Sequence, residues 1–177
     1  DTRNQTGNVS STTRAVFAGG TGTSAVIDYV EIGSLGNAID FGDLTNAVQH
    51  PAGMCNLTRG VFAGGDPGVT IDFITIATRA NATDFGDLTV ARKNALSSSN
   101  STTRGVFAGG YGGSPAAISN VIDYITIATT GDATDFGDLT TATAALDGVS
   151  NTIRGVTGGG ETPSKTNTMN KITIAST

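Results

Sequence analysis

Several residue types on which catalysis, disulfide bonding and helix formation depend are scarce in this sequence. Its 177 residues contain no Trp, one Cys and one His. Cys55 cannot form an intrachain disulfide and is expected to be a small buried apolar residue. His50, which precedes Pro51, is expected in an exposed turn. With no second histidine to act with Cys55 or any serine, the sequence predicts a protein that is not an enzyme and has no cofactor or metal.

Charge and long apolar runs are also limited. The net charge is −5, and the 10 basic residues are scattered singly, which argues against a nucleic-acid surface or an anionic-membrane patch. No apolar run approaches the ~20 residues of a membrane-spanning helix. The chain begins DTRNQTGN, partway through a repeat, so we expect a processed product or a piece of a longer protein.

A repeat of about 45 to 50 residues dominates what is present. It begins RAVFAGG at Arg14, RGVFAGG at Arg59 and Arg104, and RGVTGGG at Arg154, with separations of 45, 45 and 50 residues. A second motif, DFGDL, follows at Asp40, Asp84 and Asp135. Such a period is the mark of a repeat array. We predict one repeat domain, 1–177, with units of about 1–45, 46–89, 90–140 and 141–177.

The local pattern is that of short strands. Val121 to Ala128 alternates β-branched and aromatic residues and is bounded by turn formers, and no window has apolar residues at helical spacing. Four strands are predicted per unit, represented by Asn94 to Ser99, Gly105 to Ala108, Val121 to Ala128 and Ala133 to Leu139. The hairpin turns before DFGDL are expected to use left-handed conformations at Gly131 and Asn81. The prediction is an all-β fold of four-stranded antiparallel units.

These motifs carry a resemblance to known repeats. A hydrophobic strand that ends in Gly-Gly, a strand with an aromatic residue and an aromatic-led strand followed by Leu resemble the blade of a kelch-like β-propeller. The unit also resembles the RGVFGGG and ATDFGDLT repeats of tail-fibre-like proteins of aquatic bacteriophages and of related environmental sequences, and this match is the closer one. Phe41, Phe85 and Phe136 stand where kelch blades usually carry Trp. The resemblance implies about four blades, the last incomplete, in an extracellular setting.

Charged residues recur at fixed places in the unit. An unpaired buried charge is costly, so we expect ladders of structural ion pairs between repeat arginines and repeat aspartates. The set comprises Arg14, Arg59, Arg104, Arg154, Asp28, Asp72, Asp123, Asp40, Asp84 and Asp135. Binding of Ca²⁺ by a ring of Asp, or of an anion by the Arg residues, is the alternative. No stretch has the dense D-x-D-x-D-G spacing of a Ca²⁺ loop.

Five N-x-S/T sequons make the protein a candidate glycoprotein. They lie at Asn4, Asn8, Asn56, Asn81 and Asn100. In a chain so rich in Ser, Thr and Asn, coincidence explains them equally well, and modification would require a glycosylating source.

Two functions from different classes fit the sequence. The first is a non-enzymatic structural or adhesive module of an extracellular assembly, either a phage tail fibre on the virion surface or a helical filament. The second is a carbohydrate-binding, lectin-like propeller in which Tyr111 and the Gly-rich loops form the sugar site. Expected partners are a cell-surface glycan or protein receptor, without nucleic acid or membrane insertion.

The fourth unit ends at Thr177 without a DFGDL strand. An exposed edge strand invites pairing with another chain. We therefore expect the edge to be completed either by the N-terminal arm, Asp1 to Gly7, or by a neighbouring copy that contacts Ile172 or Ile174. The second possibility predicts a homo-oligomer built by head-to-tail contact, which forms rings or filaments.

Overall fold

The computed structural model describes residues 3–66, 68–93, 97–100, 102–112 and 117–174. All regular elements in this part of the chain are β-strands, and every strand pairing is antiparallel. The strands are β1 (Gly7–Ser10), β2 (Arg14–Ala18), β3 (Ser24–Glu31), β4 (Ile39–Val48), β5 (Ala52–Cys55), β6 (Arg59–Ala63), β7 (Thr70–Thr75), β8 (Thr83–Asp87), β9 (Arg92–Lys93), β10 (Ser97–Asn100), β11 (Arg104–Ala108), β12 (Tyr111–Gly112), β13 (Ala117–Ile118), β14 (Val121–Thr126), β15 (Thr134–Asp138), β16 (Asp147–Ser150), β17 (Arg154–Gly158) and β18 (Met169–Thr173). The all-β prediction is confirmed.

The strands form several small sheets. Sheet 1 has the order β1-β2-β3-β4, sheet 2 β5-β6-β7-β8, sheet 3 β10-β11-β14-β15 and sheet 4 β16-β17-β18. A further small sheet, β13-β12-β9, joins the Gly-rich loop of sheet 3 to the segment that precedes it. This pairing was not predicted, because two-residue strands in a Gly-rich stretch give no alternating pattern.

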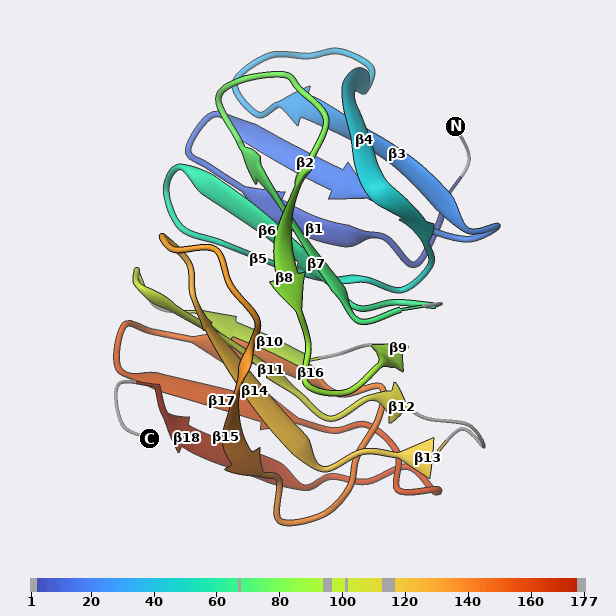
Figure 1. Ribbon diagram of the computed structural model, residues 1–177, viewed down its shortest axis with the longest axis vertical. Coiled ribbons are helices and arrows are strands. Elements are labelled where there is room, and N and C mark those ends of the chain that lie inside the picture. The colour runs from blue at the N-terminus through green and yellow to red at the C-terminus, as the bar shows by residue number, and fades with distance from the viewer. Residues whose placement is uncertain (1–2, 67, 94–96, 101, 113–116, 175–177) are drawn as a thin grey trace.

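The four main sheets follow one another along the molecule, from sheet 1 at the top of Figure 1 to sheet 4 at the bottom. Their first strands link consecutive sheets, since β1 contacts β5, β5 contacts β10 and β10 contacts β16. Each sheet therefore turns one face toward the next sheet in the chain, its forward face, and the other toward the preceding sheet, its backward face.

The hydrophobic core lies between consecutive sheets rather than within any one of them. The core between sheets 1 and 2 joins Val16 and Tyr29 of the first to Phe62 and Ile76 of the second. Two further clusters join sheet 2 to sheet 3 and sheet 3 to sheet 4. Successive side chains of a strand point to opposite faces, so a sheet in the middle of the array needs apolar residues on both.

The Gly-Gly pairs end the second strand of each unit in a conformation that side chains disfavour. Gly19, Gly64 and Gly109 have φ of 69°, 63° and 64°. A Cβ on Gly109 would lie 2.3 Å from the Thr143 carbonyl oxygen, because the segment leading to the next sheet crosses at this point.

The sequence predicted left-handed conformations at two hairpin residues, Gly131 and Asn81. Gly131 has a φ of 152°. Asn81 is not among the described residues with positive φ, so the prediction for Asn81 is wrong.

Candidate functional site

The junctions between sheets hold the chemically distinctive residues of the repeat. On the forward face, an arginine lies over an aromatic ring of its own sheet. The Arg59 guanidinium carbon is 4.3 Å from the Phe73 ring centre, and Arg104 lies equally close to Tyr124. Each ring in turn meets a second one edge-on, with 6.0 Å between the centres of Phe73 and Phe85. Arg14, Tyr29 and Phe41 repeat the arrangement in sheet 1.

These arginines connect one sheet to the next through backbone carbonyls. Arg14 donates to the carbonyl oxygens of Ile76 and Ala77, at 3.0 and 2.7 Å. Arg59 donates to Ile127 at 2.7 Å, and Arg104 to Ile174 at 2.9 Å. The stacked ring fixes the guanidinium while its N–H groups reach across the junction, so the same residue serves both contacts.

The predicted pairing of repeat arginines with repeat aspartates is wrong. In β11 and β14, Arg104 lies opposite Thr126, whereas Phe107 lies opposite Asp123. Phe107 lies three positions after Arg104, an odd number, so period-two alternation places the arginine and the aspartate on opposite faces of the sheet. The one carboxylate bonded to a repeat arginine in the described residues is that of Glu31, 2.8 Å from Arg14.

The aspartates on the backward face bind other residues. Asp28 pairs with Arg3, and Asp123 with Arg92, whose side chain is fully buried like that of its partner. Thr89 also donates to Asp123, at 2.6 Å. Asp72 is buried without an arginine and accepts bonds from the Thr45 hydroxyl and backbone N–H, at 2.7 and 2.9 Å.

A threonine from the preceding sheet thus bonds the third strand of the next at three junctions. Thr45, Thr89 and Thr140 share the DLT motif. At the last junction Thr140 bonds the Asn170 side chain at 2.8 Å, and Asn170 occupies the position of Asp72 and Asp123. The repeated threonine was visible in the sequence, but its role required knowing which strand the next sheet brings to it.

The remaining repeat aspartates lie in solvent. Asp40, Asp84 and Asp135 are exposed, and Asp40 has only a 3.9 Å contact with the exposed Arg79. Exposed pairs of this kind contribute little to stability. The described residues contain no group of three His, Cys, Asp or Glu side chains able to hold a metal ion.

The DFGDL motif instead forms a docking point in the fourth strand. Strand pairing shifts register beside Gly42, Gly86 and Gly137. At the second of these, the Asp87 backbone N–H donates to the Asp132 side chain at 3.0 Å, and the Asp87 carbonyl accepts from Ala133 at 2.8 Å. The fourth strand of one sheet therefore holds the hairpin of the next.

Arg104 and Arg154 allow the junction arginine to be tested. Replacing Arg104 with Ala is expected to lower the free energy of unfolding by about 1.5–3 kcal/mol, since a charge-assisted bond to Ile174 and a ring contact are lost. Arg154→Ala is the matched control. Arg154 is exposed and has no aromatic residue in its sheet, so a change within about 0.5 kcal/mol is expected. Urea unfolding measures both, and equal losses would contradict this role for the junction contact.

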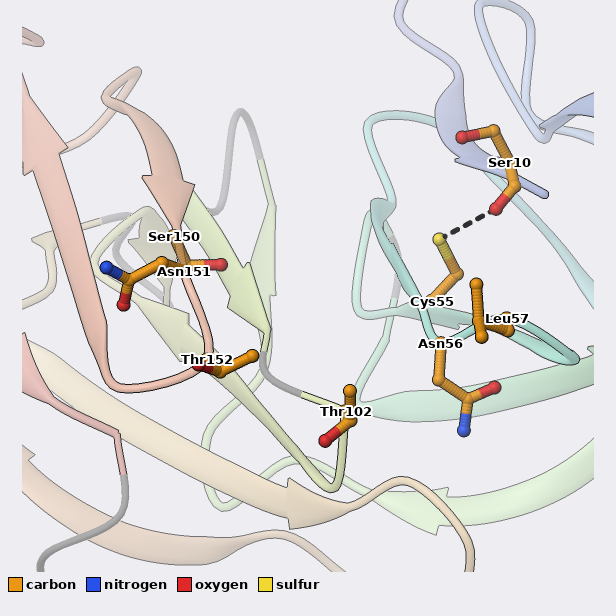
Figure 2. Close-up of a pocket in the computed structure, with 8 residues that line it drawn as sticks. All are labelled: Ser10, Cys55, Asn56, Leu57, Thr102, Ser150, Asn151 and Thr152. Carbon is orange, nitrogen blue, oxygen red and sulfur yellow. Dashed lines mark hydrogen bonds between the residues drawn. The ribbon is translucent and has the colours of Figure 1, made fainter. Parts of the chain in front are cut away.

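A second candidate site is an open pocket among the turns that precede the repeat arginines (Figure 2). Its volume is about 290 Å³, and all four main sheets contribute to it. The lining residues are Ser10, Cys55, Asn56, Leu57, Thr102, Ser150, Asn151 and Thr152. Figure 2 shows Ser150 and Asn151 on one side and Ser10 and Cys55 on the other, with Thr102 between them. Most of the exposed surface of the pocket is apolar, and the polar groups among its lining residues are hydroxyls and amides, without a charged side chain.

The turns around this pocket are held by their own side chains. The Asn56 side-chain oxygen accepts bonds from the backbone N–H groups of Thr58 and Arg59, at 2.9 and 2.7 Å. Asn151 and Ser11 do the same in their turns. Such side-chain-capped turns fix the backbone locally, so the polar rim is pre-formed.

Other residues singled out in the sequence lie elsewhere. Tyr111 does not line the pocket, and its hydroxyl donates to Glu161, which raises the pKa of Tyr111. His50 has a positive φ of 59° and a buried Nδ1, and burial lowers its pKa below 6.5, with Lys93 adding to the effect. Cys55 is half-buried and bonds the Ser10 carbonyl.

Four of the sequon side chains take part in hydrogen bonds within the chain. Asn4 accepts from Thr21, Asn8 from Thr6, Asn56 caps its turn, and Asn81 accepts from the Asp43 N–H at 3.1 Å. In the fifth sequon, Asn100 ends β10, and its neighbour Ser101 is outside the described residues.

The predicted subunit contact at Ile172 and Ile174 stays a prediction, but it would not use the Ile174 side chain. Ile174 is 1% exposed and belongs to the core between sheets 3 and 4, with Ile172 packed against that core. Nor does the described part of the N-terminal arm complete sheet 4, because Arg3 bonds the carbonyls of Gly19 and Val26 in sheet 1. Residues 1 and 2 lie outside the described part of the chain.

The two ends of the array expose faces that are buried at every internal junction. On the forward face of sheet 4, Val149 is 72% exposed, whereas Val9 at the same repeat position is 4% exposed. On the backward side of sheet 1, Ile32 is 55% exposed, whereas its equivalent Ile76 is 1% exposed.

Within the described residues, no helix has the length and apolarity to cross a membrane.

Comparisons with known proteins do not assign the chain to a family. No protein-family model matches the chain, and no curated protein matches it.

Proposed function

We propose that this chain is a non-enzymatic structural or adhesive module of an extracellular assembly, such as a phage tail fibre or a filament subunit. Its sheets would act as consecutive blades of kelch-like type, in agreement with the RGVFAGG and DFGDL motifs. The observation that carries the proposal is the location of the core. Every core cluster lies between two consecutive sheets, so the molecule gains stability by extending the array.

The contacts across the junctions suit a structural role. Each described junction combines an apolar core, an arginine that reaches the next backbone and a threonine that bonds the next third strand. These are short, directional contacts placed on both sides of an apolar layer, which resist both sliding and separation of the sheets.

The location of the protein tests the proposal directly. Antibodies against the purified chain should label virions or extracellular filaments in material from cells that carry its gene, as seen by immunogold electron microscopy. Serum from before immunisation is the control. Labelling confined to the cell interior would overturn the proposal, whatever the chain does in isolation.

Carbohydrate binding is the second candidate, and the turn pocket favours it. Its Ser and Thr hydroxyls supply neutral donors and acceptors for sugar hydroxyls, the Asn side chains supply amide N–H donors while their oxygens cap the turns, and its rim is pre-formed. The site differs from the one predicted around Tyr111.

Glycan-array binding that a simple sugar competes away would support this second function. The double variant Ser150→Ala, Thr152→Val should then bind about tenfold more weakly, since each hydrogen bond contributes about 0.5–1.5 kcal/mol. Ser34→Ala, which removes a hydroxyl from the loop between β3 and β4 that does not line this pocket, is the matched control. Absence of any glycan signal, or equal binding by both variants, would exclude the pocket as the sugar site.

A further inference from the structure

We propose that the forward face of sheet 4 binds the backward face of sheet 1 of a second copy, in the manner of consecutive sheets within the chain. This inference names the partner in the proposed structural role and rests on it. Three internal junctions of the same chain serve as the template, because each brings a forward face against a backward face.

The forward face of sheet 4 presents the apolar residues of a junction without a cover. Met169 and Val149 are each 72% exposed. The residues at their repeat positions in sheet 1, Ile27 and Val9, are 0% and 4% exposed, because sheet 2 covers them. Apolar side chains that recur at covered positions and here face water mark an interaction surface.

The backward face of sheet 1 lacks its cover in the same way. Phe17 is half-buried, whereas Phe62 and Phe107 at the same position are 2% and 0% exposed. Ile32 is exposed, although Ile76 and its equivalents in sheets 3 and 4 are fully buried. Each end face therefore lacks the neighbouring sheet that covers it at an internal junction, and each end face is the kind of cover that the other lacks.

The polar contact of the junction is available as well. Arg154 occupies the position of Arg14, and its guanidinium is exposed, with no side-chain bond to another described residue. Arg14 donates to the Ile76 carbonyl, and the equivalent acceptor in sheet 1 is the carbonyl of Ile32. Docking would place the Arg154 guanidinium on that oxygen.

Charge also favours the contact. Lys171 adds a second cation to the forward face of sheet 4, where the inner sheets have Tyr or Phe. The backward face of sheet 1 carries Asp28 and Asp40, which lie opposite each other in β3 and β4, and Arg3 already neutralises Asp28. Attraction between the exposed Asp40 carboxylate and the two cations, which Asp147 offsets in part, favours this orientation.

One residue makes the contact between copies looser than an internal junction. A Cβ on Gly60 would lie 2.7 Å from a Val9 methyl carbon, so the inner junctions use glycine here. Sheet 1 has Ala15 at this position, whose methyl group would hold the second copy slightly farther away.

The number of strands weakens the contact as well, because the described part of sheet 4 has three strands rather than four. We therefore expect weak association that increases with concentration, and a head-to-tail contact that propagates into rings or filaments.

Disulfide trapping with two single-cysteine variants tests the contact. Both carry Cys55→Ser; one adds Val149→Cys and the other Ala15→Cys. A Cβ at Gly60 would be 3.3 Å from the Val9 Cβ, close to the ~3.5–4.5 Å that a disulfide needs once the contact is slightly looser. Mild oxidation of the mixture should give a covalent dimer that contains one chain of each variant, and neither variant alone should cross-link.

Sedimentation of the untrapped chain gives an independent measure. Arg154→Glu should weaken association at least tenfold, whereas Lys165→Glu, the same charge change in an exposed loop, should leave it unchanged. A chain that stays monomeric at the highest soluble concentration and forms no mixed dimer would overturn the proposal, as would cross-linking of one variant to itself. Immunogold labelling is independent of this contact, so failure of self-docking and failure of the structural role are separable results.

Discussion

Asp123→Asn is expected to lower the free energy of unfolding by about 3–5 kcal/mol. The Arg92 guanidinium and the Asp123 carboxylate are both fully buried, and burial lowers the pKa of Arg92. Removal of the carboxylate charge leaves a buried cation without compensation, which is among the costliest single changes in a protein interior. Chemical denaturation at pH 7 measures the loss.

The same replacement at Asp72 is the matched control and should have a different outcome. Asp72 has no arginine, and burial raises its pKa above 3.8. Asp72→Asn should leave stability unchanged or raised at pH 7, because the amide can still bond Thr45, as Asn170 bonds Thr140. Equal losses in the two variants would show that the aspartates act through their hydrogen bonds and not through the charge of Arg92.

The pH dependence follows from the direction of the Asp72 shift. Since the folded protein holds this proton more tightly than the unfolded chain, the contribution of Asp72 to stability falls as pH rises from its ordinary value of 3.8 through the raised value. The advantage of Asp72→Asn should therefore be full at neutral pH and disappear below about 3.8. An advantage that is independent of pH would point to packing instead of charge.

Gly86→Ala is expected to destabilise the protein by about 3 kcal/mol or more. Gly86 has φ 145°, and a Cβ would lie 2.5 Å from the Gly131 backbone of the next sheet. Two costs add, one of about 1–3 kcal/mol for the strained conformation and a similar one for crowding at the junction.

Gly137→Ala separates these two costs. Gly137 has a similar φ of 132°, but a Cβ there would meet nothing within 4 Å. Only the conformational cost, about 1–3 kcal/mol, should remain. Thermal unfolding of the two variants measures the difference, and equal destabilisation would mean that the DFGDL strand does not hold the neighbouring hairpin.

The sequence by itself determined the main strands of this protein. The residue pattern predicted strands over Gly105 to Ala108 and Val121 to Ala128, which the structure has as Arg104–Ala108 and Val121–Thr126, and the Gly-Gly pairs marked where the second strands end. These features follow from local chemistry, because strand periodicity and left-handed turns depend on neighbouring residues alone. The sequence alone also shows that it has no second histidine to act with Cys55 or with any serine.

Only the tertiary structure decided which side chains pair with one another. Arg104 and Asp123 recur together in the repeat, but the register of β11 and β14 places them on opposite faces. Arg92, the true partner of Asp123, is replaced by Val48 and Thr143 at the other two junctions, and only Arg3, before the first unit, pairs its aspartate in the same way among the described residues. A one-residue offset reverses the face of a strand residue, and contacts between sheets join residues some 30 or more positions apart. The choice of partner therefore depends on how whole sheets stack, which the sequence of a single unit does not contain.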